Sequence, residues 1–237
     1  MKFTYLLINF LTVLIPFIYS FHPKIKFYKQ WKSFLMAAVV VALIFISWDA
    51  YFTARGVWNF NPKYLIGLNI FGLPIEEILF FICIPFACVF TYFCLNKFWN
   101  LKWKKRTETI VCLSLAAVLF IIGVAHINQV YTSFTFISTA AICLLLEFVL
   151  KVDFFSKALT TYAVLLIPFL IVNGLLTGSG LAEPVVSYNN DENLGIRILT
   201  IPIEDAVYGF ELFLLNIYFF HLFRRQSYHT SERLSFT

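Results

Sequence analysis

Seven long apolar stretches recur along the chain, separated by shorter polar or mixed segments. A helix needs roughly 20 apolar residues to cross the hydrocarbon core of a bilayer, so each stretch predicts a membrane-spanning helix. The pattern therefore indicates an all-α integral membrane protein with seven transmembrane helices. The predicted spans are Phe3–Ser20, Ser33–Tyr51, Ile75–Leu95, Thr109–Ala125, Thr132–Leu150, Ala158–Leu176 and Ile203–Phe223.

Composition agrees with a membrane protein. Of the 237 residues, 60% are hydrophobic and 13% are charged, and the mean hydropathy is +0.81. Soluble domains carry about 25% charged residues. The composition therefore excludes an ordinary soluble enzyme.

Positive charge predicts the orientation of the chain. Fourteen of the 18 Lys and Arg residues lie between spans one and two, three and four, five and six, or after span seven. Because basic loops stay in the cytoplasm, we expect a multi-pass cell-membrane protein with its N-terminus outside and its C-terminus cytoplasmic. The net charge of +5 then reflects topology and contact with the lipid bilayer, and no nucleic-acid partner is expected.

Cofactor signals are weak. The five Cys and four His residues are scattered without metal-ligand spacing, so no metal site is expected. No Gly-x-Gly-x-x-Gly or P-loop pattern appears, so no nucleotide cofactor is expected. The sequence leaves open the oligomeric state and any tightly held lipid or flavin.

An acidic motif occurs twice, each time where an apolar span begins. Pro-Ile-Glu-Glu at 74–77 aligns with Pro-Ile-Glu-Asp at 202–205, an offset of 128. Upstream, Thr53-x-x-Gly aligns with Thr177-x-x-Gly at an offset of 124, which also places Asp49 on Asn173. We therefore predict two parallel three-helix repeats, residues 1–95 and 131–237, joined by a connector at 96–130 that contains the fourth span.

The predicted topology brings five acids into one layer at the outer ends of the spans. They are Asp49, Glu76, Glu77, Glu204 and Asp205. One acid near a helix start can simply satisfy the helix dipole, and proline fits the first turn. A second adjacent carboxylate adds repulsion, and carboxylates crowded at membrane depth cannot all stay ionised. At least one of the five is therefore expected to hold a proton and to act as an acid.

Three neighbouring features leave alternatives open. Glu211 has Cys83 as its counterpart, and it is either a proton route or second acid, or a structural hydrogen-bond acceptor. Arg197 either pairs with a motif carboxylate or extends to the interface. The aromatic loop at 54–74 predicts either a lid over the acidic layer or a re-entrant segment.

Aromatic side chains surround the predicted acids. Candidates are Trp48, Trp58, Phe60, Tyr64, Phe80, Phe81, Tyr188 and Tyr208. An aromatic face stabilises a desolvated cation by roughly 2 kcal/mol. A sheltered acid beside aromatic faces suits acid-initiated cyclisation of a polyene, in which the acid protonates an alkene and a carboxylate later removes a proton. We expect the substrate to contact Trp48, Trp58, Phe80, Asn173 and Tyr208.

The segments "SWDAY", "FNPKYLIGLNIFGLPIEE" and "LGIRILTIPIED" resemble the membrane lycopene cyclase domain family. That family includes bacterial two-subunit cyclases, fused archaeal enzymes and the cyclase half of the fungal bifunctional enzyme. The resemblance implies an intramolecular lyase, or isomerase, of carotenoid biosynthesis. It would convert the linear ends of lycopene into β-ionone rings, with γ-carotene as intermediate and no net redox change.

The resemblance also implies roles for residues. Glu76, Glu77, Glu204 and Asp205 become the acid and base candidates, with Asp49 supporting them. Two positions depart from a symmetric pattern when the two repeats are aligned. Asp205 replaces a second Glu, and Val172 aligns with Trp48. Asp49 aligns with Asn173, so the two halves do not carry the same acids. This difference favours one composite site over two independent ones.

Two other readings remain. One is a related cyclase that acts on another carotenoid or makes another ring isomer. The other is a seven-helix proton-coupled transporter, which parallel repeats and membrane carboxylates would also fit. A retinal pigment is improbable, because span seven contains no lysine for a Schiff base.

Overall fold

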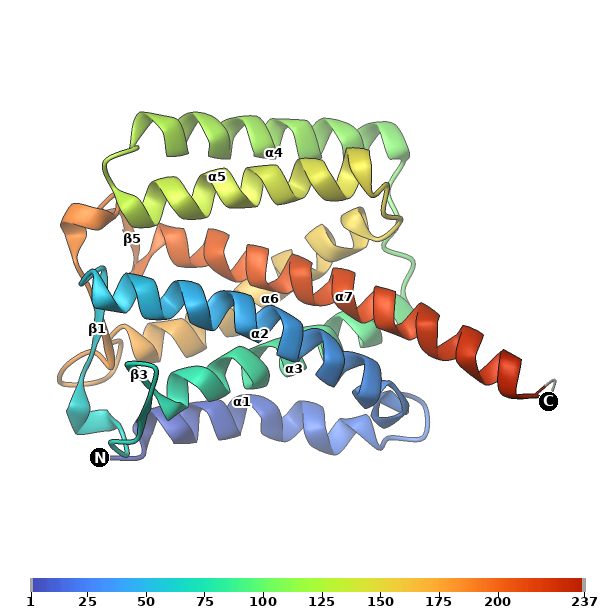
Figure 1. Cartoon of the computed structure of the whole chain (residues 1–237), viewed down its shortest axis with the longest axis horizontal. Helices are drawn as coiled ribbons and strands as arrows, with labels where there is room; N and C mark the ends of the chain where they lie inside the picture. The colour runs from blue at the N-terminus through green and yellow to red at the C-terminus, as the bar shows by residue number, and fades with distance from the viewer. Residues whose placement is uncertain (1, 236–237) are drawn as a thin grey trace.

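The structure is a computed structural model that describes residues 2–235. Residues 1, 236 and 237, at the outer limits of the two predicted repeats, lie outside the described residues. The fold is a bundle of long helices with short strands in the loops at one end (Figure 1). The helices are α1 (Thr4–Ser20), α2 (Trp31–Ala54), α3 (Ile75–Phe98), α4 (Lys105–Ala125), α5 (Val130–Leu144), α6 (Phe155–Leu176) and α7 (Ile203–Ser235).

The helices confirm an all-α, multi-pass membrane protein. Within the described residues, six helical segments are long and apolar enough to cross a membrane, and α1 is a shorter apolar helix of 17 residues. α5 continues through one π-helical turn, Leu145–Val149, which completes a stretch of membrane-spanning length. The predicted spans coincide with the helices in place, but α7 runs on past the predicted end at Phe223 to Ser235.

Helices of the two predicted repeats pack in corresponding ways. α1 packs on α3 in the first half, and α5 packs on α7 in the second. Across the halves, α2 packs against α7 and α3 packs against α6. α4 packs along α5 at the edge of the bundle (Figure 1).

The loops at one end of the bundle form three antiparallel ladders. β1 (Trp58–Phe60) pairs with β4 (Val186–Tyr188), which joins the loop after α2 to the loop after α6. β2 (Asn69–Ile70) pairs with β3 (Leu73–Pro74), and β5 (Arg197–Ile198) pairs with β6 (Ile201–Pro202). Short 3-10 turns complete the connections at Phe27–Gln30, Pro62–Tyr64 and Asn190–Glu192.

The same hydrogen bonds recur 128 residues apart in these loops. The Asn61 N–H donates to the Val185 carbonyl, and the Asn189 N–H donates to the Val57 carbonyl, each at 2.8 Å. The strand pairs β2–β3 and β5–β6 have the same register at the same offset. Both motif prolines end a strand and directly precede the first residue of their helix.

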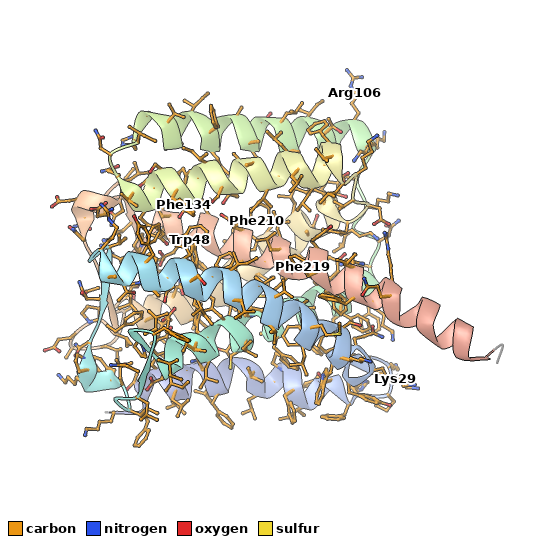
Figure 2. All side chains as sticks on the ribbon, in the orientation of Figure 1. Lys29, Trp48, Arg106, Phe134, Phe210 and Phe219 are labelled. Atoms are coloured by element: carbon orange, nitrogen blue, oxygen red, sulfur yellow. The ribbon has the colours of Figure 1, made fainter. Side chains whose placement is uncertain are left out.

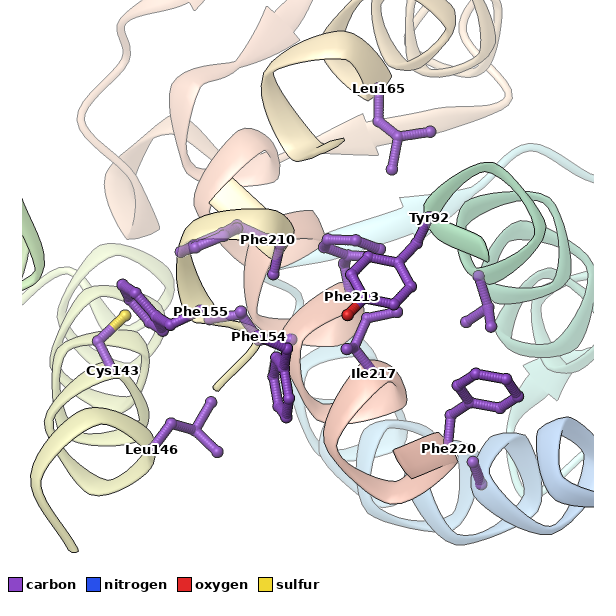
Figure 3. Close-up of a cluster of buried hydrophobic side chains, with 14 of the residues drawn as sticks. Tyr92, Cys143, Leu146, Phe154, Phe155, Leu165, Phe210, Phe213, Ile217 and Phe220 are labelled. Atoms are coloured by element: carbon purple, nitrogen blue, oxygen red, sulfur yellow. The ribbon is translucent and has the colours of Figure 1, made fainter. Parts of the chain in front are cut away.

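Packed aromatic residues fill the opposite end of the bundle. Tyr92 from α3 contacts Phe213 from α7, and Phe220 lies about two helical turns further along α7 (Figure 3). Phe213 and Phe220 are fully buried, with 2% or less of each side chain exposed. This core holds α3 and α7 together away from the ladders.

Two basic side chains mark the end of the bundle that is remote from the ladders. Figure 2 shows Lys29, before α2, and Arg106, in the first turn of α4, at the side of the bundle where α7 leaves it. The acidic motifs begin α3 and α7 at the other side. These two basic residues and the acidic motifs therefore lie at opposite ends of the bundle.

Candidate active site

Each acidic motif divides its two carboxylates between two tasks. The first acid of each pair holds a loop. Glu76 is fully buried, and its Oε1 accepts the Ile66 N–H at 2.7 Å. Glu204 is also fully buried, and its Oε1 accepts the Leu194 N–H at 2.8 Å and the Thr132 hydroxyl at 2.6 Å. Because carboxylate oxygens replace missing backbone acceptors here, Glu76 and Glu204 stabilise the loop ahead of their own helices.

The second acid of each pair faces a cavity and accepts a tyrosine hydroxyl. Tyr5 in α1 donates to Glu77 at 2.5 Å, and Tyr131 in α5 donates to Asp205 at 2.6 Å. Asp205 also accepts the Tyr188 hydroxyl at 2.9 Å and the Asn173 amide at 3.3 Å. Adjacent helical residues point about 100° apart, which separates the two acids of one motif.

Asp49 reaches the same cavity from α2. Its side chain is 2% exposed, and among the described residues its Oδ2 has no hydrogen-bond partner. A buried polar atom without a partner is costly, which marks Asp49 as a residue whose position needs a functional reason. Asp49, Glu77 and Asp205 thus line one cavity from three helices of both predicted repeats.

The cavity has a volume of about 140 Å³. On the same measure a single water needs about 10–15 Å³, so the space holds a fragment of many heavy atoms. Apart from the three acids, most of its walls are apolar or aromatic. Lining residues near the acids include Tyr5, Trp58, Phe60, Phe80, Tyr131, Asn173, Tyr188 and Tyr208.

Four rings form a connected aromatic wall. Trp58 lies 5.2 Å from Tyr131 and 6.4 Å from Tyr208 between ring centroids, and Tyr131 stacks on Tyr188 at 6.0 Å. Burial, followed by the Asp205 carboxylate, raises the pKa of Tyr188 well above its ordinary value of 10.0. Tyr188 therefore stays protonated and donates to Asp205 throughout the neutral range.

Four of the five predicted substrate contacts line the cavity: Trp58, Phe80, Asn173 and Tyr208. Trp48 lies behind the wall, with its ring 5.4 Å from Tyr208 and 4.2 Å from Phe134. Figure 2 shows Trp48 and Phe134 side by side between α2 and α5. Trp48 therefore supports the ring of Tyr208 from outside.

The aromatic loop after α2 packs as a lid. Trp58 and Tyr64 are buried, with 5% and 2% of their side chains exposed. The indole N–H of Trp58 donates to the Thr53 hydroxyl at 2.9 Å, which fixes the ring over the cavity. The ladder with β4 then joins this lid to the loop of the second half.

Sequence reasoning missed the two tyrosines that bind the cavity acids. Tyr5 lies in predicted span one and Tyr131 directly before predicted span five, two segments that the predicted repeat makes counterparts, at an offset of 126. Aligning those spans with each other, and not the acidic motifs alone, would have revealed the matched pair.

The two uncertain polar residues take structural positions. Arg197 donates to the Thr200 carbonyl and to Asn190 Oδ1, each at 2.8 Å, so it holds its own hairpin and pairs with neither motif acid. Glu211 accepts the Ser138 and Thr139 hydroxyls, each at 2.8 Å, between α7 and α5. This geometry fits the structural alternative for Glu211.

Comparison with known proteins gives several relatives of one kind, each named bifunctional lycopene cyclase/phytoene synthase. The protein from Podospora anserina is 34% identical over 59 residues, covering 25% of this chain and 10% of the relative. The protein from Phycomyces blakesleeanus is 38% identical over 64 residues, covering 26% of this chain and 10% of the relative. The protein from Aspergillus oryzae is 24% identical over 98 residues, covering 40% of this chain and 17% of the relative. The matched segments thus span about a tenth to a sixth of these relatives. No solved structure matches the chain significantly.

The family model described as lycopene cyclase matches most of the sequence. It covers residues 2–95 and 128–223, and so includes both acidic motifs and all three cavity acids. Residues 96–127, which contain α4, fall between the two matched parts. The resemblance seen in the sequence is confirmed: the chain belongs to the lycopene cyclase family.

Proposed function

We propose that this chain is a lycopene β-cyclase of carotenoid biosynthesis, which closes the linear ends of lycopene into β-ionone rings. The observation that carries the proposal is the meeting of Asp49, Glu77 and Asp205, from both halves of the chain, in one aromatic cavity. An alkene is a weak base, so its protonation needs a carboxylic acid that is sheltered from water and held against it.

The hydrogen bonds favour different roles for the three acids. Asp205 accepts from Tyr131, Tyr188 and Asn173, which is more side-chain donors than reach Glu77 or Asp49 among the described residues. Glu77 accepts from Tyr5 alone among the described side chains, and Asp49 lies in the same cavity. Two acids that share a site with a third carboxylate cannot all be charged. We assign the proton to the Asp49–Glu77 pair and the base to Asp205.

The reaction balances as one proton in and one proton out. The acid pair protonates the terminal alkene, which leaves a tertiary cation. The neighbouring double bond attacks that cation and forms the ring bond, so the charge moves to a ring carbon. Asp205 then removes a proton from the adjacent carbon to give the new ring double bond. The choice of carbon decides the ring isomer.

The cavity wall suits the charge that develops during this sequence. The rings of Trp58, Tyr131 and Tyr208 surround the space beside the acids. Each aromatic face stabilises a desolvated cation by roughly 2 kcal/mol, and together they hold water away from it. Because no electrons are gained or lost, we propose that the carboxylates suffice without a redox cofactor.

We further propose the topology that the charge pattern predicts: seven spans, with α1 as the first, an outer N-terminus and a cytoplasmic C-terminus. The repeats at 1–95 and 131–237 and the connector at 96–130 are supported by the recurring loop hydrogen bonds and by the gap in the family match. The basic residues at the end remote from the acids support a cavity near the outer face.

Expression of the chain in a lycopene-accumulating bacterium, followed by pigment chromatography, tests the function. The proposal predicts that γ-carotene and β-carotene replace lycopene. Unchanged lycopene beside well-expressed membrane protein would contradict it. Products with another ring isomer would mean that an acid still starts the reaction and that the base removes a proton from a different carbon.

A further inference from the structure

The cavity continues past the acids into the bundle, between α3 and α6. On α3 its wall is formed by Phe80, Ile84 and Cys88, which share one face of the helix and span about 12 Å along it. On α6 the facing wall includes Leu165 and Phe169. The extension is apolar, whereas the acids lie at its ladder-bearing end.

This extension reaches the outer surface of the bundle. Pro168 lines the cavity and is also exposed. Its neighbours Ile167 and Ile171 are 68% and 62% exposed, as expected for side chains that face lipid. Pro168 therefore belongs both to the cavity wall and to the exposed, apolar surface of α6.

The corresponding interface in the other half of the fold is closed. Under the repeat, the pair α6 and α3 corresponds to α2 and α7, at offsets of 124 and 128. There Phe45 is fully buried and packs on Tyr208 with 5.1 Å between ring centroids. Val41 and Leu212 are also buried in that contact, with 0% and 4% exposed.

Two kinds of substitution explain why one interface is open. Proline lies inside both helices of the open interface, at Pro85 and Pro168, and helix-internal proline weakens regular packing. We call the apolar extension between α3 and α6 the groove. The small Ala87 lines it at the position that corresponds to Leu215 in the closed interface. Fewer side-chain atoms therefore fill the space between α3 and α6.

We propose that this groove, which Ala87 lines, is the lateral site through which the polyene chain of the substrate leaves the bilayer and in which the part of the chain next to the reacting end lies. The inference rests on the proposed function and extends it. A long apolar chain has its lowest free energy in lipid, so access from the side avoids crossing water. The groove leads to the three carboxylates at one end, so a single end group reaches the acids in each binding event.

Because the described residues form one groove, the two ends of the substrate react one after the other. A substrate with two linear ends presents the second end only after the first ring has left the acid cavity. The one-ring product must slide back into the bilayer and bind again in the opposite direction. The second cyclisation therefore depends on release, and the groove residues set which chains fit.

Filling the groove at Ala87 tests the proposal. The graded variants are Ala87→Val and Ala87→Leu, and the matched control is Ala163→Leu on the exposed face of α6. Each is made alone and together with Glu77→Gln, which stops turnover so that bound lycopene stays lycopene. Purified proteins in lycopene-loaded liposomes are then compared by bound lycopene per chain and by the visible circular dichroism that a protein site induces in it.

We expect Glu77→Gln with Ala163→Leu to bind as much lycopene as Glu77→Gln alone. We expect a stepwise loss with Ala87→Val and at least a fivefold loss with Ala87→Leu. Ala87→Val covers the case in which the larger variant does not fold. Unchanged binding in both Ala87 variants would overturn the groove. If lycopene binds in this pattern but wild-type protein makes no ring, the groove is supported and the proposed function is wrong. If Ala87→Leu forms rings at the wild-type rate, the proposed function is supported and the groove is wrong.

Discussion

Trp58 pairs with Tyr188 across the ladder that joins the loop after α2 to the loop after α6, and their rings lie 6.0 Å apart between centroids. Trp58 comes from the loop of the first half, and Tyr188 from the loop of the second. Tyr188 also donates a hydrogen bond to Asp205. The pair therefore closes one roof over acids of both halves, so the chain has a composite cavity rather than two separate ones.

The acids that face the cavity carry the chemistry in our account. We expect Glu77→Gln and Asp205→Asn each to lower the rate of ring formation at least about 100-fold, because general acid or base catalysis contributes roughly 10²–10⁴-fold. The rate is measured as cyclised carotenoid per folded protein in lycopene-loaded liposomes. Either variant working at more than a tenth of the wild-type rate would remove that residue from its role.

Glu76 and Glu204 form the matched comparison, since each adjoins a cavity acid but holds a loop. Replacing either by Ala leaves a buried backbone N–H unpaired, at Ile66 or Leu194, which costs about 1–3 kcal/mol. We expect Glu76→Ala and Glu204→Ala to lower the unfolding temperature.

In the corresponding Gln variants the acceptor oxygen remains. We expect Glu76→Gln and Glu204→Gln to keep ring formation per folded protein within about threefold of wild type, since neither residue lines the cavity. A loss of about 100-fold in a Gln variant of undiminished stability would assign catalysis to the loop-holding acids instead.

Tyr5 and Tyr131 position the cavity acids. Removing one donor to a charged group costs about 1.5–3 kcal/mol, or roughly tenfold to a hundredfold in rate where the charge matters in the transition state. We expect Tyr131→Phe to lower kcat in that range with KM for lycopene unchanged. A rise in KM at constant kcat would show that the ring of Tyr131 binds substrate and that its hydroxyl is dispensable.

Much of this arrangement follows from the sequence. Apolar length predicts the helices, and the offsets of 128 and 124 predict that Asp49 and the two motifs meet at one end. These predictions succeed because burial in lipid leaves few ways to satisfy a backbone other than a helix. The aromatic residues after α2 predict a packed segment, either a lid or a re-entrant segment, and the buried Trp58 and Tyr64 fit the lid.

The rest depends on rotations and contacts that the pattern does not encode. Which acid of a pair faces the cavity is set by the rotation of α3 and α7, and a helix that is apolar all round carries little periodic signal for it. The ladder between Trp58 and Tyr188 joins residues 130 positions apart. The open groove arises because two similar interfaces pack differently around Ala87 and Pro168, which appears once the helices are placed.

An exposed contact beside the ladder predicts a pH effect on the lid. The Asn61 amide, at 3.0 Å, and then the Lys63 ammonium hold the pKa of Glu183 below its ordinary value of 4.5. A lowered folded pKa stabilises the contact above the ordinary pKa, and this is lost as pH falls through the lowered value. Because the side chains are half exposed, the effect on overall stability is small.

Amide exchange in β1 and β4 measures this effect. We expect wild-type protein to protect these amides more than Glu183→Gln near neutral pH, and the difference to vanish in acid below the lowered pKa of Glu183. An equal difference at both pH values would mean that the charge of Glu183 does not hold the lid.

The central claim is that a protein-bound proton starts the reaction, and cyclisation in D₂O tests it most directly. Carboxyl protons exchange with solvent, whereas the ring carbon that receives the proton does not exchange it afterwards. Mass spectrometry of products from wild-type protein in lycopene-loaded liposomes should show one deuterium for each ring formed. Rings formed in D₂O without deuterium would contradict the account.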